Sequence, residues 1–388
     1  MALFQYFPNN YVWNLSVAIA LESGAQIGEI EDMCAPLRAA AARGEDAGTG
    51  EFLKQWIHCA DNLVGLAEED LALGRGYSAA AKLDRASLYF QVAERMQDRG
   101  APARAETYAK AVGSFQRSID AGGRNFRRVE IPYENGAITG YFTVTDTGGR
   151  PAPTVLYVNG LDSTKEMLAW SGLPAALARR GISTLSIDQP GTGEALRLHK
   201  LHAVYDTERW ASVVVDWLEK QPEVDAHRLG MGGISLGGYY APRAVANEPR
   251  FACGFVWGAN HNWGEVQQAR RRNEGERPVP HYWNHVSWVW GASNLEDFMG
   301  LCPKINLNGQ MEKIRVPFLI THGEKDRQIP VKYAHQSYDQ LVNSPKRDLK
   351  IFTAREGGVE HVGADNMAFG RDFIADWVAD VLGGHNHN

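Results

Sequence analysis

The sequence predicts an α/β protein with a mostly parallel central sheet flanked by helices, preceded by a separate helical domain. Residues 28–120 are rich in alanine and repeat apolar side chains at helical spacing. Beyond residue 125, short β-rich segments alternate with helical segments, which is typical of a parallel sheet. The 388 residues also exceed the ~150 that one ordinary core organises. We therefore expect a helical N-terminal domain at 1–125 and an α/β domain at 126–388.

The helical domain is predicted from apolar stripes that can be buried only against other helices. One stripe recurs every three or four residues within 53–66, and a second lies within 89–96. Two adjacent glycines within 120–124 end the last helix in a turn. We expect this domain to form a cap over the α/β domain.

The α/β domain opens with a hairpin, because Glu134-Asn135-Gly136 separates two β-rich segments. The strands expected after it are residues 154–159, 182–188, 229–233, 253–258, 317–322 and 349–353. The helices expected between them are residues 164–180, 206–221, 236–247, 331–341 and 366–382. A Trp- and Arg-rich segment at about 259–311 interrupts this alternation. It is too long for a plain loop, and we predict a lid-like insertion there.

Composition and charge argue against several classes of function. The chain has 40 Lys and Arg against 46 Asp and Glu, which disfavours nucleic-acid binding and docking on an anionic membrane. No apolar run reaches the roughly 18 residues of a spanning helix, and the N-terminus lacks the features of a signal peptide. The four cysteines have no metal-binding spacing. We expect a cytoplasmic protein without metal or organic cofactor, and its oligomeric state is open, a homodimer included.

The segment Gly233-Ile-Ser235-Leu-Gly237 matches the pattern G-x-S-x-G, which on its own arises readily by chance. Its context is more specific, because a buried β-rich segment precedes Ser235 and a helical segment follows it. A serine at such a strand-to-helix elbow is exposed as a nucleophile, and the flanking glycines let backbone pass closely. A serine in an ordinary tight turn is the alternative. We predict that Ser235 is a catalytic nucleophile.

A nucleophilic serine needs a base, and the base needs an acid that orients it. At an elbow of this kind the chain order is serine, acid, histidine, with each partner just past a later strand. Asp326 follows the strand at 317–322 and is the predicted acid, with Glu324 as the near alternative. His361 follows the strand at 349–353 and is the predicted base.

An oxyanion hole needs two backbone N–H groups aimed at the developing negative charge. The amide after the nucleophile, that of Leu236, is the expected first donor. The second is expected in the loop after the strand at 154–159, where Asn159-Gly160 precedes Leu161. An ordinary turn at Asn159-Gly160 is the alternative, and we predict that Leu161 is the second donor.

Three segments resemble a known family. They are 159–166 (NGLDSTKE), 188–194 (DQPGTGE) and 233–243 (GISLGGYYAPR). They resemble α/β-hydrolases of the 2,6-dihydroxypseudooxynicotine hydrolase group, which is related to fungal polyketide-shortening hydrolases and FrsA-like esterases. The resemblance implies the α/β-hydrolase fold and assigns the same serine, acid, histidine and oxyanion roles to the residues named above.

The resemblance also implies a reaction. The group includes enzymes that cleave a carbon–carbon bond next to a ketone on an aromatic ring, with an additional glutamate after the strand that follows the nucleophile. Glu265 matches that position and is the expected additional acid, although His261 and Asn262 depart from the group's pattern. A solvated helix residue is the alternative for Glu265.

The insertion contains aromatic residues with two interpretations. Trp257, Trp263 and Trp283 belong either to the core or to the floor of a pocket for a flat ring. His281 and His285 have helical metal-pair spacing but lack a glutamate and a third ligand, so no metal site is predicted.

Together these features predict a serine-dependent hydrolase with a small-molecule carbonyl substrate. The preferred reaction is cleavage of a C–C bond next to a ketone in an aromatic or polyketide-like compound. Hydrolysis of a carboxylic ester is the alternative, and a non-catalytic binding protein on a hydrolase scaffold is a remote one.

Overall fold

The computed structural model describes residues 3–43, 49–272 and 276–386, and these form two compact units. The helical unit comprises the described residues of 2–126 together with 277–285. The sheet unit comprises those of 127–276 and 286–388.

The helical unit is built from helices whose apolar faces are buried against one another. These are α1 (Tyr11–Glu22), α2 (Ile27–Cys34), α3 (Arg38–Ala41), α4 (Thr49–Ala72), α5 (Gly76–Arg95) and α6 (Arg104–Gly122). A row of aromatic rings links three of them: Trp13 of α1 lies 5.0 Å from Phe52 of α4, and Trp56 of α4 lies 5.6 Å from Tyr89 of α5. All four side chains are fully buried. Trp56 and Tyr89 belong to the two predicted apolar stripes, whereas the other two rings lie outside them.

A buried ion pair joins α5 to α6. Arg104 Nε lies 2.6 Å from Glu94 Oε1, and the two side chains are only 5% and 1% exposed. Arg104 Nη1 also donates to the carbonyl oxygen of Gln97, which follows α5. Removing one partner from such a pair leaves an uncompensated buried charge, which is costly.

We therefore expect Glu94→Gln to lower the free energy of unfolding by ~3 kcal/mol, measured by urea denaturation. The matched control is Glu106→Gln on α6, because Glu106 pairs with Lys110 in an exposed position. That substitution should change the free energy of unfolding by less than ~1 kcal/mol. Equal effects of the two substitutions would show that the Glu94 pair is not a stabilising element.

The sheet unit contains one eight-stranded sheet. Its strands are β1 (Arg127–Tyr133), β2 (Gly136–Thr143), β3 (Ala152–Val158), β4 (Ser183–Asp188), β5 (Val224–Ile234), β6 (Phe251–Trp257), β7 (Phe318–Gly323) and β8 (Arg347–Phe352). Their order is β1-β2-β4-β3-β5-β6-β7-β8. The β1–β2 hairpin pairs antiparallel with β4, and the other neighbours are parallel. The predicted fold class is thereby confirmed, hairpin included.

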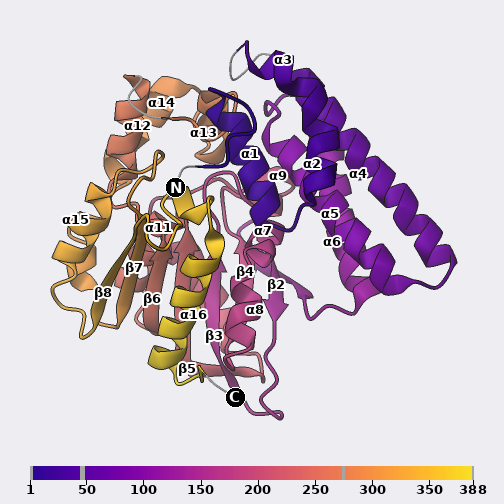
Figure 1. Cartoon of the computed structure of the whole chain (residues 1–388). Helices are drawn as coiled ribbons and strands as arrows, with labels where there is room; N and C mark the ends of the chain where they lie inside the picture. The colour runs from indigo at the N-terminus through magenta and orange to yellow at the C-terminus, as the bar shows by residue number, and fades with distance from the viewer. Residues whose placement is uncertain (1–2, 44–48, 273–275, 387–388) are drawn as a thin grey trace. The chain divides into compact units, whose positions relative to one another are not determined.

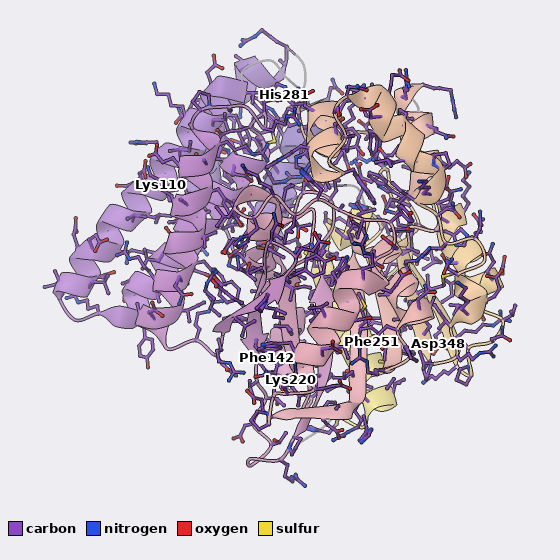
Figure 2. The ribbon with its side chains drawn as sticks, turned by 180° about the vertical axis from the view of Figure 1, so that it is seen from behind. Lys110, Phe142, Lys220, Phe251, His281 and Asp348 are labelled. Carbon is purple, nitrogen blue, oxygen red and sulfur yellow. The ribbon has the colours of Figure 1, made fainter. Side chains whose placement is uncertain are left out.

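Helices cover both faces of this sheet. On one face, α8 (Leu173–Ala178) and α16 (Met367–Leu382) bury Leu177, Ile374 and Val378 against β3 and β6 (Figure 1). On the other face, α10 (Glu208–Leu218) and α11 (Gly237–Asn247) lie toward the viewer in Figure 2. Phe251 and Asp348, labelled in Figure 2, lie near the starts of β6 and β8, so the loops that follow these strands are at the opposite edge.

Among the described residues, three further helices complete the layers around the sheet: α7 (Lys165–Trp170), α9 (Gly193–Arg197) and α15 (Lys332–Gln340). The single helix predicted at 164–180 is instead split into α7 and α8. Gly172 lies between them with φ +74°, a left-handed conformation that glycine adopts readily and that ends the first helix.

The predicted insertion contains α12 (Trp263–Arg271), α13 (Tyr282–Val289) and α14 (Leu295–Leu301). Residues 277–285 belong to the helical unit, so α13 begins in one unit and ends in the other. Among the described residues, none of the helices is both long and apolar enough to span a bilayer.

Candidate active site

Ser235 lies at the sharp turn between β5 and α11 with φ 58°, in the left-handed region that non-glycine residues avoid. Two backbone hydrogen bonds hold the turn. Ser235 N–H donates to the carbonyl oxygen of Trp257 at 2.9 Å, and Gly238 N–H donates to that of Ser235 at 2.8 Å. The backbone strain is thus held by β6 on one side and by the first turn of α11 on the other.

The glycines beside Ser235 are required by close backbone approach. A Cβ on Gly233 would lie 2.2 Å from the carbonyl oxygen of Gly237, and a Cβ on Gly238 would lie 2.0 Å from that of Gly258. Neither position has room for a side chain. Gly233 is the first glycine of the G-x-S-x-G pattern, so that position of the pattern reports a packing constraint, and Gly238, just after the pattern, adds a second.

A continuous chain of hydrogen bonds connects three predicted residues. Ser235 Oγ lies 2.8 Å from His361 Nε2, and His361 Nδ1 lies 2.8 Å from Asp326 Oδ2. An ionised carboxylate only accepts, so His361 donates through Nδ1, which leaves Nε2 free to accept the serine proton. The arrangement can therefore activate the Ser235 hydroxyl as a nucleophile.

Asp326 is fully buried, and its other oxygen, Oδ1, accepts from the backbone N–H groups of Gln328 and Ile329 at 2.7 and 2.9 Å. Burial raises the pKa of Asp326, but the adjacent His361 and the hydrogen bonds outweigh it, and the net shift is downward. Asp326 thus stays ionised at neutral pH. The alternative acid, Glu324, instead accepts from the Ala354 N–H.

The loop that carries His361 is fixed by a second carboxylate. Asp365 accepts the backbone N–H groups of Gly358, Val359 and Glu360, the three residues before the histidine, at 2.9–3.2 Å. These three hydrogen bonds fix the backbone of the loop. The imidazole of His361 is therefore positioned both by this backbone and by its contact with Asp326.

His322 is a residue of the site that the sequence analysis did not single out. It is fully buried near the end of β7, where its Nδ1 accepts from Ala259 N–H at 3.0 Å and its Nε2 donates to the Ile329 carbonyl at 2.9 Å. Burial lowers its pKa, which keeps the ring neutral as these two contacts require. His322 thereby connects the loop after β6 to the loop of Asp326. Its only sequence signal was a histidine inside an apolar strand.

The predicted oxyanion donors lie beside the nucleophile. Leu236 follows Ser235 directly and forms the N-cap of α11, so its N–H precedes the helix. Gly160 packs against the nucleophile so closely that a Cβ there would lie 2.8 Å from Ser235 Cβ. Leu161, the next residue, is buried. The loop after β3 is therefore brought to Ser235, as the predicted oxyanion hole requires.

Glu265 lies apart from this hydrogen-bonded chain. It is in the first turn of α12, with a side chain 48% exposed and Oε1 3.2 Å from Lys332 Nζ. It lines a cavity of about 220 Å³ with Lys332, Tyr333 and Arg327, the last of which follows Asp326 directly. The buried environment on which the predicted acid role depends is not present at Glu265.

The three tryptophans predicted for a pocket have different surroundings. Trp257 is in the core beneath α16, where its indole leaves no room for a Cβ on Gly370. Trp263 is buried and stacks on Trp290 at 5.6 Å. Trp283 is half-buried in the helical unit, 5.2 Å from Tyr282. For Trp257, the core interpretation is the one the contacts favour.

In the part of the chain that the structure describes, no three His, Cys, Asp or Glu side chains are grouped so that they could hold a metal ion. His281 of the candidate metal pair instead lies 3.9 Å from Asp98 within the helical unit.

The sheet order, the elbow at Ser235 and the loops that converge on it define an α/β-hydrolase, and the chain is an enzyme of this class. The esterase FrsA-like family matches residues 52–254, and the prolyl oligopeptidase family matches residues 174–385. Each match spans more than half of the chain, which therefore belongs to the FrsA-like esterases and, through its C-terminal part, to the wider prolyl oligopeptidase family.

Individual relatives are similar over most of their length. Hydrolase LUC6 of Fusarium sp. is 28% identical, over 98% of this chain and 99% of its own. The 2,6-dihydropseudooxynicotine hydrolase of Paenarthrobacter nicotinovorans is 26% identical, over 84% and 83%. The crystal structure of a 2,6-dihydroxy-pseudo-oxynicotine hydrolase matches the fold with a TM-score of 0.75 at 24% identity, over 94% and 95%.

The contact between Gly160 and the nucleophile can be tested directly. In Gly160→Ala the new Cβ would lie 3.1 Å from Ser235 Oγ, so the hydroxyl must shift out of line with His361. We expect kcat to fall on the order of 100-fold, because small displacements of reacting groups are costly. The control is Gly300→Ala on α14, whose Cβ would meet no atom within 4 Å and which should leave kcat unchanged. Wild-type kcat in folded Gly160→Ala would contradict the close contact.

Proposed function

We propose that the chain hydrolyses a carbonyl compound through a covalent intermediate on Ser235. The observation that carries this proposal is the hydrogen-bonded chain from Ser235 Oγ through His361 to Asp326, with both links at 2.8 Å. Ser235 Oγ attacks the carbonyl carbon while His361 Nε2 takes the hydroxyl proton, and buried Asp326 stabilises the imidazolium.

The rest of the reaction follows from the same groups. The carbonyl oxygen becomes an oxyanion, which the N–H groups of Leu236 and Leu161 are proposed to stabilise. When the bond to the leaving group breaks, His361 returns its proton to that group. A water molecule, deprotonated by His361, then attacks the acyl-enzyme and releases the acid product and free Ser235.

For the substrate, we propose a ketone of an aromatic or polyketide-like compound, cleaved at the C–C bond next to the carbonyl. The support is the similarity over most of the chain to a 2,6-dihydropseudooxynicotine hydrolase, together with a match to 20-hydroxy-prefusarin hydrolase FUS2 of Gibberella moniliformis over 77% of each chain. Ester hydrolysis is the second candidate, and membership of the FrsA-like esterases favours it.

The two chemistries make different demands on the site. An ester expels an alkoxide, which His361 can protonate, so the three side chains and the oxyanion donors suffice. A C–C bond expels a carbanion, a far poorer leaving group unless it is protonated or delocalised as an enolate. Glu265 is the proposed extra acid of the C–C reaction. Its exposed ion pair with Lys332 counts against that role and thereby favours ester hydrolysis, which needs no extra acid.

The proposed nucleophile and base are tested by Ser235→Ala and His361→Ala. Each should reduce turnover by several orders of magnitude, on the order of 10⁴ to 10⁶, and the double variant should be little worse than either. Turnover is measured on a panel of aryl esters and β-diketones, with folding checked by circular dichroism. Near-wild-type turnover by folded Ser235→Ala would remove the nucleophile from the proposal.

The role of Glu265 is tested by Glu265→Gln, which keeps the size of the side chain but removes the carboxyl group that could donate a proton. On the C–C proposal, ketone cleavage should fall by ~100-fold, because general acid–base catalysis contributes 10²–10⁴-fold, while hydrolysis of an activated aryl ester is spared. The matched control is Lys332→Met, which removes the partner of Glu265 but not the carboxyl group. Equal effects of Glu265→Gln on both substrates, or none on either, would exclude Glu265 and favour the esterase.

A further inference from the structure

A cluster of charged side chains is buried in the sheet unit beside the loop after β3. Lys165 is fully buried, and its Nζ lies 2.7 Å from Glu166 Oε1, 2.8 Å from Glu194 Oε1 and 3.1 Å from Asp188 Oδ2. Arg128 of β1 reaches the same Glu194 and binds both of its oxygens at 2.7 Å. Three buried carboxylates thus share the buried Lys165 and the partly exposed Arg128, which is costly unless every buried group is well paired.

Asp188 is the member with the most complete set of partners. Its Oδ1 accepts from Lys165 N–H at 2.7 Å, and its Oδ2 accepts from Glu194 N–H at 3.0 Å as well as from Lys165 Nζ. A Cβ on Gly193 would lie 1.9 Å from its carboxyl carbon, so the chain leaves that position bare for the carboxylate. Burial raises the pKa of Asp188 to about 6, against the opposing effect of Lys165.

The cluster is connected to the loop of Gly160 and Leu161. Asn159 Nδ2 donates to the Ile187 carbonyl at 2.8 Å, next to Asp188, and the Asn159 backbone exchanges two hydrogen bonds of 3.0 Å with the Gln189 side chain. Within the loop, Ser163 Oγ accepts from Gly160 N–H at 3.0 Å and donates to Asn159 Oδ1 at 2.9 Å. The loop is therefore fixed at both ends, by β4 at Asn159 and by the charged cluster at Lys165.

We propose that Asp188 and Lys165 are positioning residues of the oxyanion hole, which hold residues 159–165 so that the Leu161 amide faces the carbonyl oxygen attacked by Ser235. This inference rests on the proposed function. Neither residue touches the reacting atoms. Each acts through the backbone. The N–H of Lys165 is bound to the carboxylate of Asp188, which fixes the end of the loop. Asp188 also lies at the end of β4, where Asn159 is hydrogen-bonded to the Ile187 carbonyl and to the Gln189 side chain.

The physical reason is the direction in which an oxyanion donor must point. A backbone N–H stabilises the transition state only if it is aimed at the oxyanion in advance, because reorientation during the reaction costs part of the gain. Residues 159–165 are mostly buried, but Leu161 is the one large apolar side chain among them. Buried ion pairs are directional and break at a high cost, so they can supply this rigidity where apolar contacts cannot.

The test uses Asp188→Asn in the full chain, with kcat and KM measured on an activated aryl ester. Inhibition by an aryl trifluoromethyl ketone, whose adduct with Ser235 carries an oxyanion, is compared with inhibition by the matched methyl ketone. We expect kcat/KM to fall on the order of 100-fold with KM nearly unchanged, and the Ki of the trifluoromethyl ketone to rise by a similar factor. The Ki of the methyl ketone should stay at its wild-type value.

The matched control is Glu130→Gln. Glu130 also pairs with Arg128, at 2.9 Å, but it is exposed and contacts the cluster only through that arginine. This variant should keep wild-type kinetics and both Ki values. If Asp188→Asn does not fold, Ser163→Ala removes the hydrogen bonds that the half-buried Ser163 makes within the loop, without unpairing a buried charge, and the same criterion applies to it.

The outcomes separate the positioning role from the proposed function. Parallel changes in kcat/KM and in the Ki of the trifluoromethyl ketone support the positioning role. Unchanged values for both in a folded variant, or equal weakening of both ketones, would overturn it and leave a structural cluster. Failure of a fluorophosphonate to label wild-type Ser235 would instead overturn the proposed function itself.

Discussion

The strained backbone of Ser235 is the constraint on which the rest of the site depends. Its φ of 58° is of a kind that costs on the order of 1–3 kcal/mol and persists only where the surroundings fix it. Here the surroundings are the carbonyl of Trp257, the glycines Gly233 and Gly238, which admit neighbouring backbone, and Gly160, which admits the Ser235 side chain. The sheet therefore sets the position of the Ser235 hydroxyl, and the loops that carry the other residues of the site must be placed relative to that hydroxyl.

The two loops that carry Asp326 and Leu161 are held near Ser235 by different kinds of contact. The carboxylate of Asp326 itself accepts from neutral backbone N–H groups, beside the buried His322, whose contacts need an uncharged ring. Cations hold its loop only further along, where Arg270 binds Gln328 and Arg327 pairs with Glu360. The loop of Leu161 ends instead at fully ionic contacts around Lys165. The difference follows from charge. Asp326 must keep its negative charge for His361, and a second full cation beside it would compete with the imidazolium that forms during the reaction.

Much of this could be predicted from the sequence, because the signals were periodic or ordered. The alternation of segments predicted the sheet, and chain order with strand ends was enough to select Ser235, Asp326 and His361, which the structure brings within hydrogen-bonding distance. The rest depended on tertiary contacts. The break at Gly172 needed its left-handed φ, and the transfer of residues 277–285 to the helical unit leaves no trace in local spacing. Glu265 matched a position but not the burial that its role requires.

The buried charged cluster around Lys165 shows that sequence patterns near the Ser235 elbow do not reveal every residue that shapes the site. One short segment contains Asp188, Gly193 and Glu194. Its two carboxylates are paired only by Lys165 and Arg128, which come from other parts of the chain, so the segment alone does not reveal the cluster. Gly193 is bare because the carboxylate of Asp188 occupies the space of its side chain, which no propensity scale could report. Burial opposes ionisation of Glu194, but Arg128 and Lys165 outweigh it and hold the pKa of that group at about 2. Glu194 therefore stays ionised and keeps its ion pair with Lys165, at one end of the Leu161 loop, while His361 changes its protonation with every turnover.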